Sequence, residues 1–258
     1  DQAGVAYPTP DWTWADAVTA AKAIRALGDD IWGLYSPIQF WEFYKKAGQN
    51  GCQFFNADMT ESTINAPECV EALELMVSFL NEDIMPDEIE LAGVVNEDLF
   101  KQGKLGMVVI GIWMFAMFQD APFAWDIELE PGMVNKGHHF FANGVAAAAS
   151  TKHPAEAAAL AQFLTASEEA ATIRVETGWE LPALDKPEYF ESYLALDKPA
   201  NRAAVFAALE SPITPPVIER QNEMQDTINN LLNAVANGEL DPQTALDTAK
   251  AELDKLIQ

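Results

Sequence analysis

The chain alternates between segments with the apolar spacing of helices and short apolar runs typical of strands. Apolar residues recur at helical spacing from Trp14 to Leu27, and Gly28 follows as a typical helix stop. Similar signals predict one helix that begins at residues 65–67 and another that ends at residue 102. They also predict helices over residues 39–47, 155–164, 167–177, 199–209, 217–236 and 242–257.

Short apolar runs between these helices predict strands over residues 31–35, 53–55, 105–110, 124–129 and 144–150. The run from Leu105 to Ile110 is apolar throughout, which fits a strand buried on both faces. Strands separated by helices predict an α/β fold, and the helical carboxy-terminal tail predicts a helix-rich edge.

Composition and charge exclude several classes of protein. Hydrophobic residues make up 49% of the 258 positions, but no run of about eighteen apolar residues occurs, so we expect a soluble globular chain of one large or two small domains. Fifteen Lys and Arg against forty Asp and Glu give a net charge of −25, which repels phosphate backbones. Nucleic acid is therefore excluded as a partner, and we interpret the acidic surface as a means of solubility.

Motifs for catalysis and metal binding are absent. There is no Gly-x-Ser-x-Gly, no phosphate-binding glycine loop and no His-Glu-x-x-His. The three histidines, His138, His139 and His153, do not have the spacing of a metal pair and are interpreted as surface loop residues. Glu128 and Glu130 could serve glycoside hydrolysis, but such pairs arise by chance among forty acids. We predict no enzyme activity, no cofactor and no metal.

Cys52 and Cys69 are the two cysteines of the chain. They lie on either side of a turn-rich segment, so a disulfide could join a strand to the start of the next helix, and two buried thiols are the alternative.

Some of the seven tryptophans stand beside Gly or Pro at the ends of predicted strands, where an indole can face a cleft. Trp113, Trp179 and the pair Phe40 and Trp41 meet that description. Because aromatic rings are more often buried, a core position is the alternative for each.

Six segments resemble, in order, those of the extracellular solute-binding proteins of ABC sugar importers, the family that includes maltose-binding protein. The segment Phe100-Lys-Gln-Gly-Lys-Leu-Gly-Met107 with Gly111-Ile-Trp113 is similar to the family's F-x-x-G-K-x-A-M followed by G-x-W. The other segments are Ala3 to Asp16, Ile64-Asn-Ala-Pro-Glu68, Ala142-Asn-Gly144, Ser150 to Ala157 and Gly178-Trp-Glu-Leu-Pro182. The resemblance covers nearly the whole chain.

The resemblance implies a periplasmic-binding-protein-like two-lobe α/β fold of type II. It implies that residues 1–136 and 200–258 form the second lobe and that 137–199 form the returning part of the first. Family members extend further at the amino end, so we expect that this chain lacks a signal peptide and most of the first lobe.

The resemblance also implies how a sugar is bound, in a cleft between the lobes. Trp113 would stack on the sugar, and Gly111 would let backbone or sugar approach closely. The loop from Tyr35 to Trp41 would contribute Phe40 or Trp41 as a stacker and Gln39 as a hydrogen-bonding partner. Asn143 and Trp179 would reach the ligand from the first-lobe side. Residues 219–224 carry no Trp, unlike some sugar binders, which argues against maltodextrin-type specificity.

By resemblance, the partners are a small-molecule carbohydrate and the membrane permease subunits of an ABC importer. The full-length protein is expected to be a monomer, located in the periplasm or outside the cell, with a lipid anchor at the amino end as one option. Two alternatives stay open: a binding protein for a non-sugar solute such as a polyamine, and a glycan-active enzyme.

Overall fold

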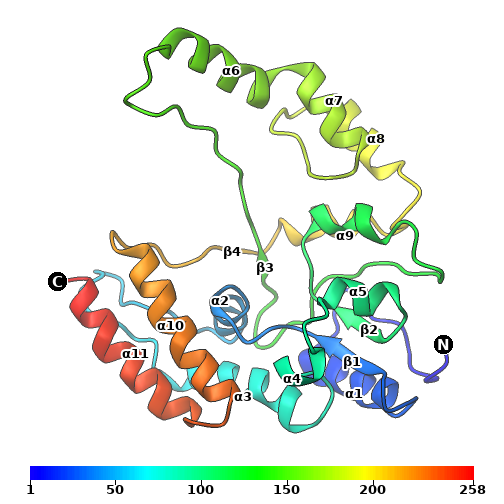
Figure 1. Cartoon of the computed structure of the whole chain (residues 1–258), viewed down its shortest axis with the longest axis vertical. Helices are drawn as coiled ribbons and strands as arrows, with labels where there is room; N and C mark the ends of the chain where they lie inside the picture. Colours follow the sequence, from blue (N-terminus) through cyan, green and yellow to red (C-terminus); the bar gives the residue numbers. More distant parts are fainter. The chain divides into compact units, whose positions relative to one another are not determined.

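A computed structural model describes residues 1–258 (Figure 1). The chain divides into two compact units. Unit 1 comprises Asp1–Val109, Leu129–Phe140 and Ala208–Gln258, and unit 2 comprises Ile110–Glu128 and Phe141–Ala207. The predicted division fell after residues 136 and 199, and the assignment of these segments to lobes stays a prediction.

Unit 1 holds most of the helices and both small sheets. Its elements are α1 (Trp14–Arg25), β1 (Trp32–Tyr35), α2 (Phe40–Gln49), α3 (Pro67–Asn81), α4 (Glu88–Leu91), α5 (Asn96–Lys101), β2 (Leu105–Val108), β3 (His138–His139), β4 (Pro212–Ile213), α10 (Gln221–Ala236) and α11 (Pro242–Leu256).

Unit 2 is helical. Its elements are the 3₁₀-helix η1 (Ile112–Phe118), α6 (Pro154–Ala166), α7 (Glu168–Glu176), α8 (Pro187–Leu194) and α9 (Ala203–Ala208), whose last residue lies at the boundary with unit 1. Of these helices, α8 was not predicted from the sequence. No helix of the structure has both the length and the apolar character that a membrane span requires.

The helix starts in unit 1 follow local rules. Thr13 and Asp16 form a reciprocal capping box at α1, and Pro67 occupies the first turn of α3, where its missing N–H costs nothing. Helix α2 has no capping side chain of its own. The amide N–H of Phe40 instead donates to Asn229 Oδ1 of α10 at 2.8 Å, so a distant helix supplies this cap.

The strands predicted over residues 31–35 and 105–110 form as β1 and β2. They pair in parallel, in a register that sets Trp32 beside Leu105. Gly33 lets α1 approach this pair closely, because a Cβ at that position would lie 2.3 Å from the backbone oxygen of Ala21. A parallel pair that contacts a helix is the α/β arrangement expected from the sequence.

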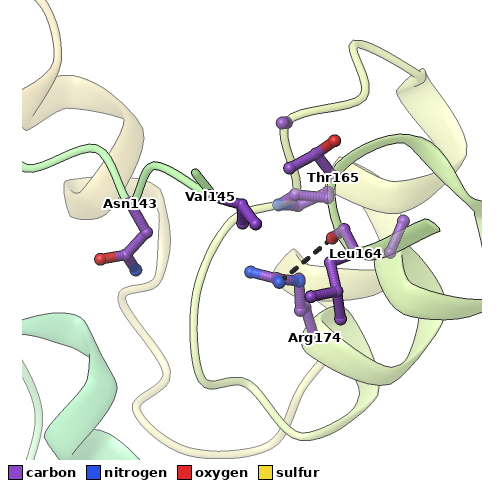
Figure 2. Close-up of a pocket in the computed structure, with 8 residues that line it drawn as sticks. Asn143, Val145, Leu164, Thr165 and Arg174 are labelled. Atoms are coloured by element: carbon purple, nitrogen blue, oxygen red, sulfur yellow. Dashed lines mark hydrogen bonds between the residues drawn. The ribbon is translucent and has the colours of Figure 1, made fainter. Parts of the chain in front are cut away.

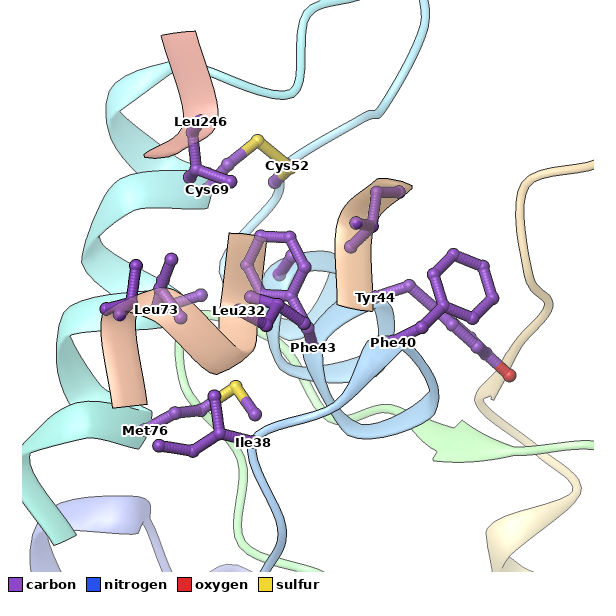
Figure 3. Packing of buried hydrophobic residues seen from close by; sticks show 14 of the residues in the cluster. Ile38, Phe40, Phe43, Tyr44, Cys52, Cys69, Leu73, Met76, Leu232 and Leu246 are labelled. Atoms are coloured by element: carbon purple, nitrogen blue, oxygen red, sulfur yellow. A yellow bond between two sulfur atoms is a disulfide. The ribbon is translucent and has the colours of Figure 1, made fainter. Parts of the chain in front are cut away.

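The main core lies among α1, α2, α3, α10 and α11 (Figure 3). Phe40, Phe43, Leu73 and Met76 from α2 and α3 are fully buried. A disulfide joins Cys52 to Cys69 beside Leu246 of α11 (Figure 3). It closes a loop with a sequence separation of 17, which contributes about 3 kcal/mol in the chain-entropy account.

Three predicted strands do not form, because a strand requires a neighbour for its backbone hydrogen bonds. Residues 53–55 make only an isolated bridge between Phe55 and Ser62. Within 124–129, side chains take the carbonyl groups: Asn201 donates to Ile127 O at 3.0 Å and Trp12 to Leu129 O at 2.6 Å. Residues 144–150 pair with no strand and are exposed throughout.

Unit 2 has a smaller core, in which Phe115, Val175, Tyr193 and Val205 are buried. Helix α6 contributes no buried residue to it. Its packing is thus sparser than that of unit 1.

Candidate functional site

The residues predicted to bind a ligand fall into two sets. Gln39, Phe40 and Trp41 belong to unit 1, whereas the remaining four, Gly111, Trp113, Asn143 and Trp179, belong to unit 2.

The unit 1 set lies at the start of α2. Gln39 is exposed, and Trp41 is 38% exposed. Phe40 is fully buried, and its ring contacts that of Trp41 edge-on with the centroids 5.3 Å apart. Phe40 is thus a core residue, and the prediction that it could stack on a ligand is corrected, because a helix turns successive side chains in different directions. Of the two rings, Trp41 is the accessible one.

In unit 2, the indole of Trp113 lies directly over Gly111. A Cβ on Gly111 would be only 2.2 Å from Cη2 of Trp113. The absence of a side chain at Gly111 therefore makes room for the Trp113 indole, rather than for the backbone or sugar that was predicted to approach there. Trp113 is nonetheless 45% exposed, a high value for so large an apolar side chain.

A second exposed ring stands beside Trp113. Phe141 is 47% exposed, and its ring meets the indole at an interplanar angle of 67° with the centroids 6.3 Å apart. Phe141 was not among the ligand-binding residues predicted from the sequence. The only available signal was its place two residues before Asn143, which would put both side chains on one side of an extended segment.

Polar side chains continue this surface. The Asn143 amide donates to Glu180 Oε2 at 2.8 Å, and the other oxygen of Glu180 pairs with the Arg174 guanidinium. Arg174 also donates to the carbonyl oxygen of Leu164 at 3.2 Å (Figure 2). Trp179, which precedes Glu180 in the chain, is half exposed.

A cavity of about 60 Å³ lies next to these polar groups (Figure 2). Its lining consists of Asn143, Val145, Leu164, Thr165, Ala171, Arg174, Pro182 and Ala183. Asn143 and Arg174 therefore have both a fixed hydrogen-bonding partner and access to open space.

A separate group of charged residues is buried in unit 1. Lys45 and Lys46 of α2 are fully buried, and the Glu42 carboxylate accepts hydrogen bonds from both, at 2.9 and 2.8 Å. Glu130 Oε2 lies 2.5 Å from Lys45, and His139 Nε2 lies 3.3 Å from Glu42 Oε1. These five residues, here called the buried ion cluster, hold two carboxylates against two ammonium groups.

The pKa values in the buried ion cluster follow from burial and from these neighbours. Burial opposes charge on Glu42, but the ammonium groups of Lys45 and Lys46 hold its pKa well below the usual value. Burial lowers the pKa of Lys46, and it also lowers that of His139, although Glu42 acts in the opposite direction on both. Because the buried charges compensate each other, we interpret the cluster as structural. The helical spacing of apolar residues did not indicate that these charged side chains are buried.

The histidines differ from the surface loop residues that were predicted. His138 and His139 form β3, and His138 is buried. The prediction failed because these residues pair with Pro212 and Ile213 of β4, which lie far away in the sequence. His153 is exposed, at the start of α6. No group of three or more His, Cys, Asp or Glu side chains is placed to hold a metal ion. Of the two carboxylates considered for glycoside hydrolysis, Glu130 is paired with Lys45.

Comparison with known proteins gives consistent matches over the chain. The family of bacterial extracellular solute-binding proteins matches residues 1–187. An ABC substrate-binding protein from Listeria monocytogenes, solved in complex with cycloalternan, aligns with a TM-score of 0.96 at 42% identity, over 99% of this chain and 66% of that one.

Two curated relatives are more distant. A galactooligosaccharide-binding protein of Bacillus subtilis is 29% identical over 191 residues, which cover 72% of this chain and 44% of the relative. A binding protein of Brucella abortus is 25% identical over 267 residues, which cover 100% of this chain and 63% of the relative. The chain thus spans somewhat less than two thirds of the Brucella relative's length. The match to the Listeria structure confirms the predicted periplasmic-binding-protein-like α/β fold.

Proposed function

The chain belongs to the bacterial extracellular solute-binding proteins, and from that premise we propose that it is the carbohydrate-binding component of an ABC importer. The observation that carries the proposal is the similarity to the Listeria protein that was solved with cycloalternan. The Bacillus relative is also named for a carbohydrate ligand. An oligosaccharide is the ligand class that we propose.

The prediction that the chain is not an enzyme is confirmed by its membership of a solute-binding family. Delivery of the sugar to permease subunits, a monomeric full-length protein, and a location in the periplasm or on a lipid anchor outside the cell are further parts of the proposal. They rest on the family alone.

The unit 2 surface has the chemistry that a sugar requires. A sugar presents apolar C–H faces and polar hydroxyl groups, so its site combines flat aromatic surface with a few fixed polar groups. Trp113 and Trp179 offer exposed indoles, and Asn143 offers an amide held in place by Glu180. Gln39 and Trp41 in unit 1 are the further contacts that we propose.

The charges on this surface favour a neutral sugar over a polyamine. A polyamine requires uncompensated carboxylates, whereas Glu180 is paired with Arg174. The overall charge of −25 is spread over the chain and supplies no local selectivity.

Isothermal calorimetry of the protein at its full natural length tests the proposal. The ligands are cycloalternan, a galactooligosaccharide, glucose, galactose and spermidine, and the variant is Trp113→Ala. Loss of a stacking tryptophan that a bound ligand buries costs about 2 kcal/mol, or roughly thirtyfold in Kd. We expect oligosaccharide binding that weakens by that amount.

Phe163→Ala is the matched control, because Phe163 lies in the same unit and is 46% exposed, close to the value for Trp113. Its oligosaccharide affinity should equal that of the wild type. Binding of spermidine but of no carbohydrate would overturn the proposed function.

A further inference from the structure

Phe141 and Trp113 enclose a corner on the surface of unit 2. Their ring planes meet at 67°, with the centroids 6.3 Å apart, and each ring is nearly half exposed. Two exposed aromatic rings in contact represent apolar area that a folded chain ordinarily buries. Such an area is available for a ligand to cover.

The corner is held in place from behind. The six-membered ring of Trp113 rests against Gly111, so the indole cannot move further in that direction. Phe115, two residues after Trp113 in η1, is buried in the core of unit 2 and fixes this short helix. The exposed surface of the indole is therefore presented in a defined direction, which reduces the entropy cost of binding.

A polar edge adjoins the corner through the chain itself. Asn143 follows Phe141 by two residues on an extended run between β3 and α6 (Figure 1), a spacing that places both side chains on one side. Asn143 donates its amide N–H to Glu180, so its amide oxygen is oriented as an acceptor. Arg174 fixes Glu180 in turn.

On this basis we infer that Phe141 is a second stacking wall of the carbohydrate site and that Glu180 positions Asn143 at its polar edge. This inference rests on the proposed function. Two rings at an angle provide two platforms, so a ligand with two linked sugar units that are not coplanar contacts both. A single sugar unit that stacks on Trp113 uses only one. The site therefore selects bent oligosaccharides over monosaccharides.

The test compares Phe141→Ala with wild type in the full natural-length protein by calorimetry, with cycloalternan, a galactooligosaccharide, glucose and galactose as probes. We expect a roughly tenfold or greater loss of affinity for the oligosaccharides and a smaller loss for the monosaccharides. Phe141→Tyr, which keeps the ring, should restore oligosaccharide binding. Phe141→Leu keeps apolar bulk without the ring, so it should bind as weakly as Phe141→Ala.

Phe140→Ala is the matched control. Phe140 is 45% exposed, and alternation along an extended chain directs its side chain away from that of Phe141. Circular dichroism and the melting temperature establish that each variant is folded. If Phe141→Ala does not fold, the comparison of Phe141→Leu with wild type tests the inference.

The outcomes separate the two proposals. If Trp113→Ala loses binding while Phe141→Ala and Phe141→Leu bind as wild type, the second wall is wrong and the proposed function stands. An equal loss for monosaccharides and oligosaccharides would overturn the selectivity. If the wild type binds no carbohydrate, the proposed function fails, and the inference fails with it.

For Glu180, the test is Glu180→Ala alongside Asn143→Ala and their double variant. A positioning role predicts that the double variant loses no more affinity than Asn143→Ala alone, because Glu180 then acts only through Asn143. Additive losses would show that Glu180 contacts the ligand directly, or acts elsewhere.

Discussion

Gly111 acts at the scale of a single residue, through the indole that covers it. Its backbone angles of φ −85° and ψ 154° suit any residue, so alanine fits the chain, but an added Cβ meets the Trp113 ring at 2.2 Å. We predict that Gly111→Ala displaces the ring and weakens oligosaccharide binding nearly as much as Trp113→Ala does. Calorimetry measures the affinity, and the melting temperature should change little because the exposed indole can swing outward.

Gly28→Ala is the control for that experiment. A Cβ at Gly28 would make only ordinary contacts, the nearest with Ile31 Cγ1 at 3.4 Å. Its affinity should match that of wild type. A Gly111→Ala variant that binds normally would mean that the ring position does not matter for binding.

At the scale of elements, α2 and β3 are joined by the buried ion cluster, and this junction makes stability depend on pH. Burial lowers the pKa of His139 below its usual 6.5, so folding favours the neutral imidazole. The unfolded chain binds the proton more readily, and stability present above pH 6.5 is lost as the pH falls towards the folded pKa. A lowering of this pKa by one contributes about 1.4 kcal/mol to the free energy of unfolding at neutral pH.

We therefore predict that the free energy of unfolding falls between pH 7 and pH 5, and that the fall is shallower in His139→Gln. Urea denaturation at several pH values measures it. Some of the slope should remain, because burial also lowers the pKa of His138. Below about pH 4.5 Glu42, whose pKa Lys45 and Lys46 lower, adds a further loss in both proteins. An unchanged slope in His139→Gln would contradict the assignment.

At the scale of the whole molecule, the net charge of −25 is an unfavourable term for folding. Like charges repel more strongly in the compact chain than in the unfolded one, and salt screens that repulsion. We predict that the melting temperature rises by a few degrees between about 10 mM and 300 mM NaCl. Exposed ion pairs such as Lys136 with Asp11 contribute little that salt could remove.

Differential scanning fluorimetry measures this effect, and a neutral solute at equal osmolarity serves as the control. The neutral solute should raise the melting temperature less than the salt does. A fall with added NaCl would mean that attractive surface pairs outweigh the net repulsion.

Much of the fold and part of the candidate site could be predicted. Thr13, Pro67 and Gly103 mark helix ends through interactions within one turn, so their signals are local and readable. Three of the predicted strands failed for the opposite reason, because residues 53–55, 124–129 and 144–150 lack a partner strand. An apolar pattern indicates that a segment could form a strand, but it does not indicate whether another strand pairs with it.

The sequence by itself determined the α/β class, the positions of most helices, the acidic surface and the candidate aromatic residues. Only the tertiary structure decided that Phe40 is buried beside an accessible Trp41, that Lys45 and Lys46 lie inside, and that Phe141 stands against Trp113. The physical reason is that helix caps and periodicity depend on neighbours within a turn. Burial, charge pairing and ring contacts depend on residues that are brought together from distant parts of the chain.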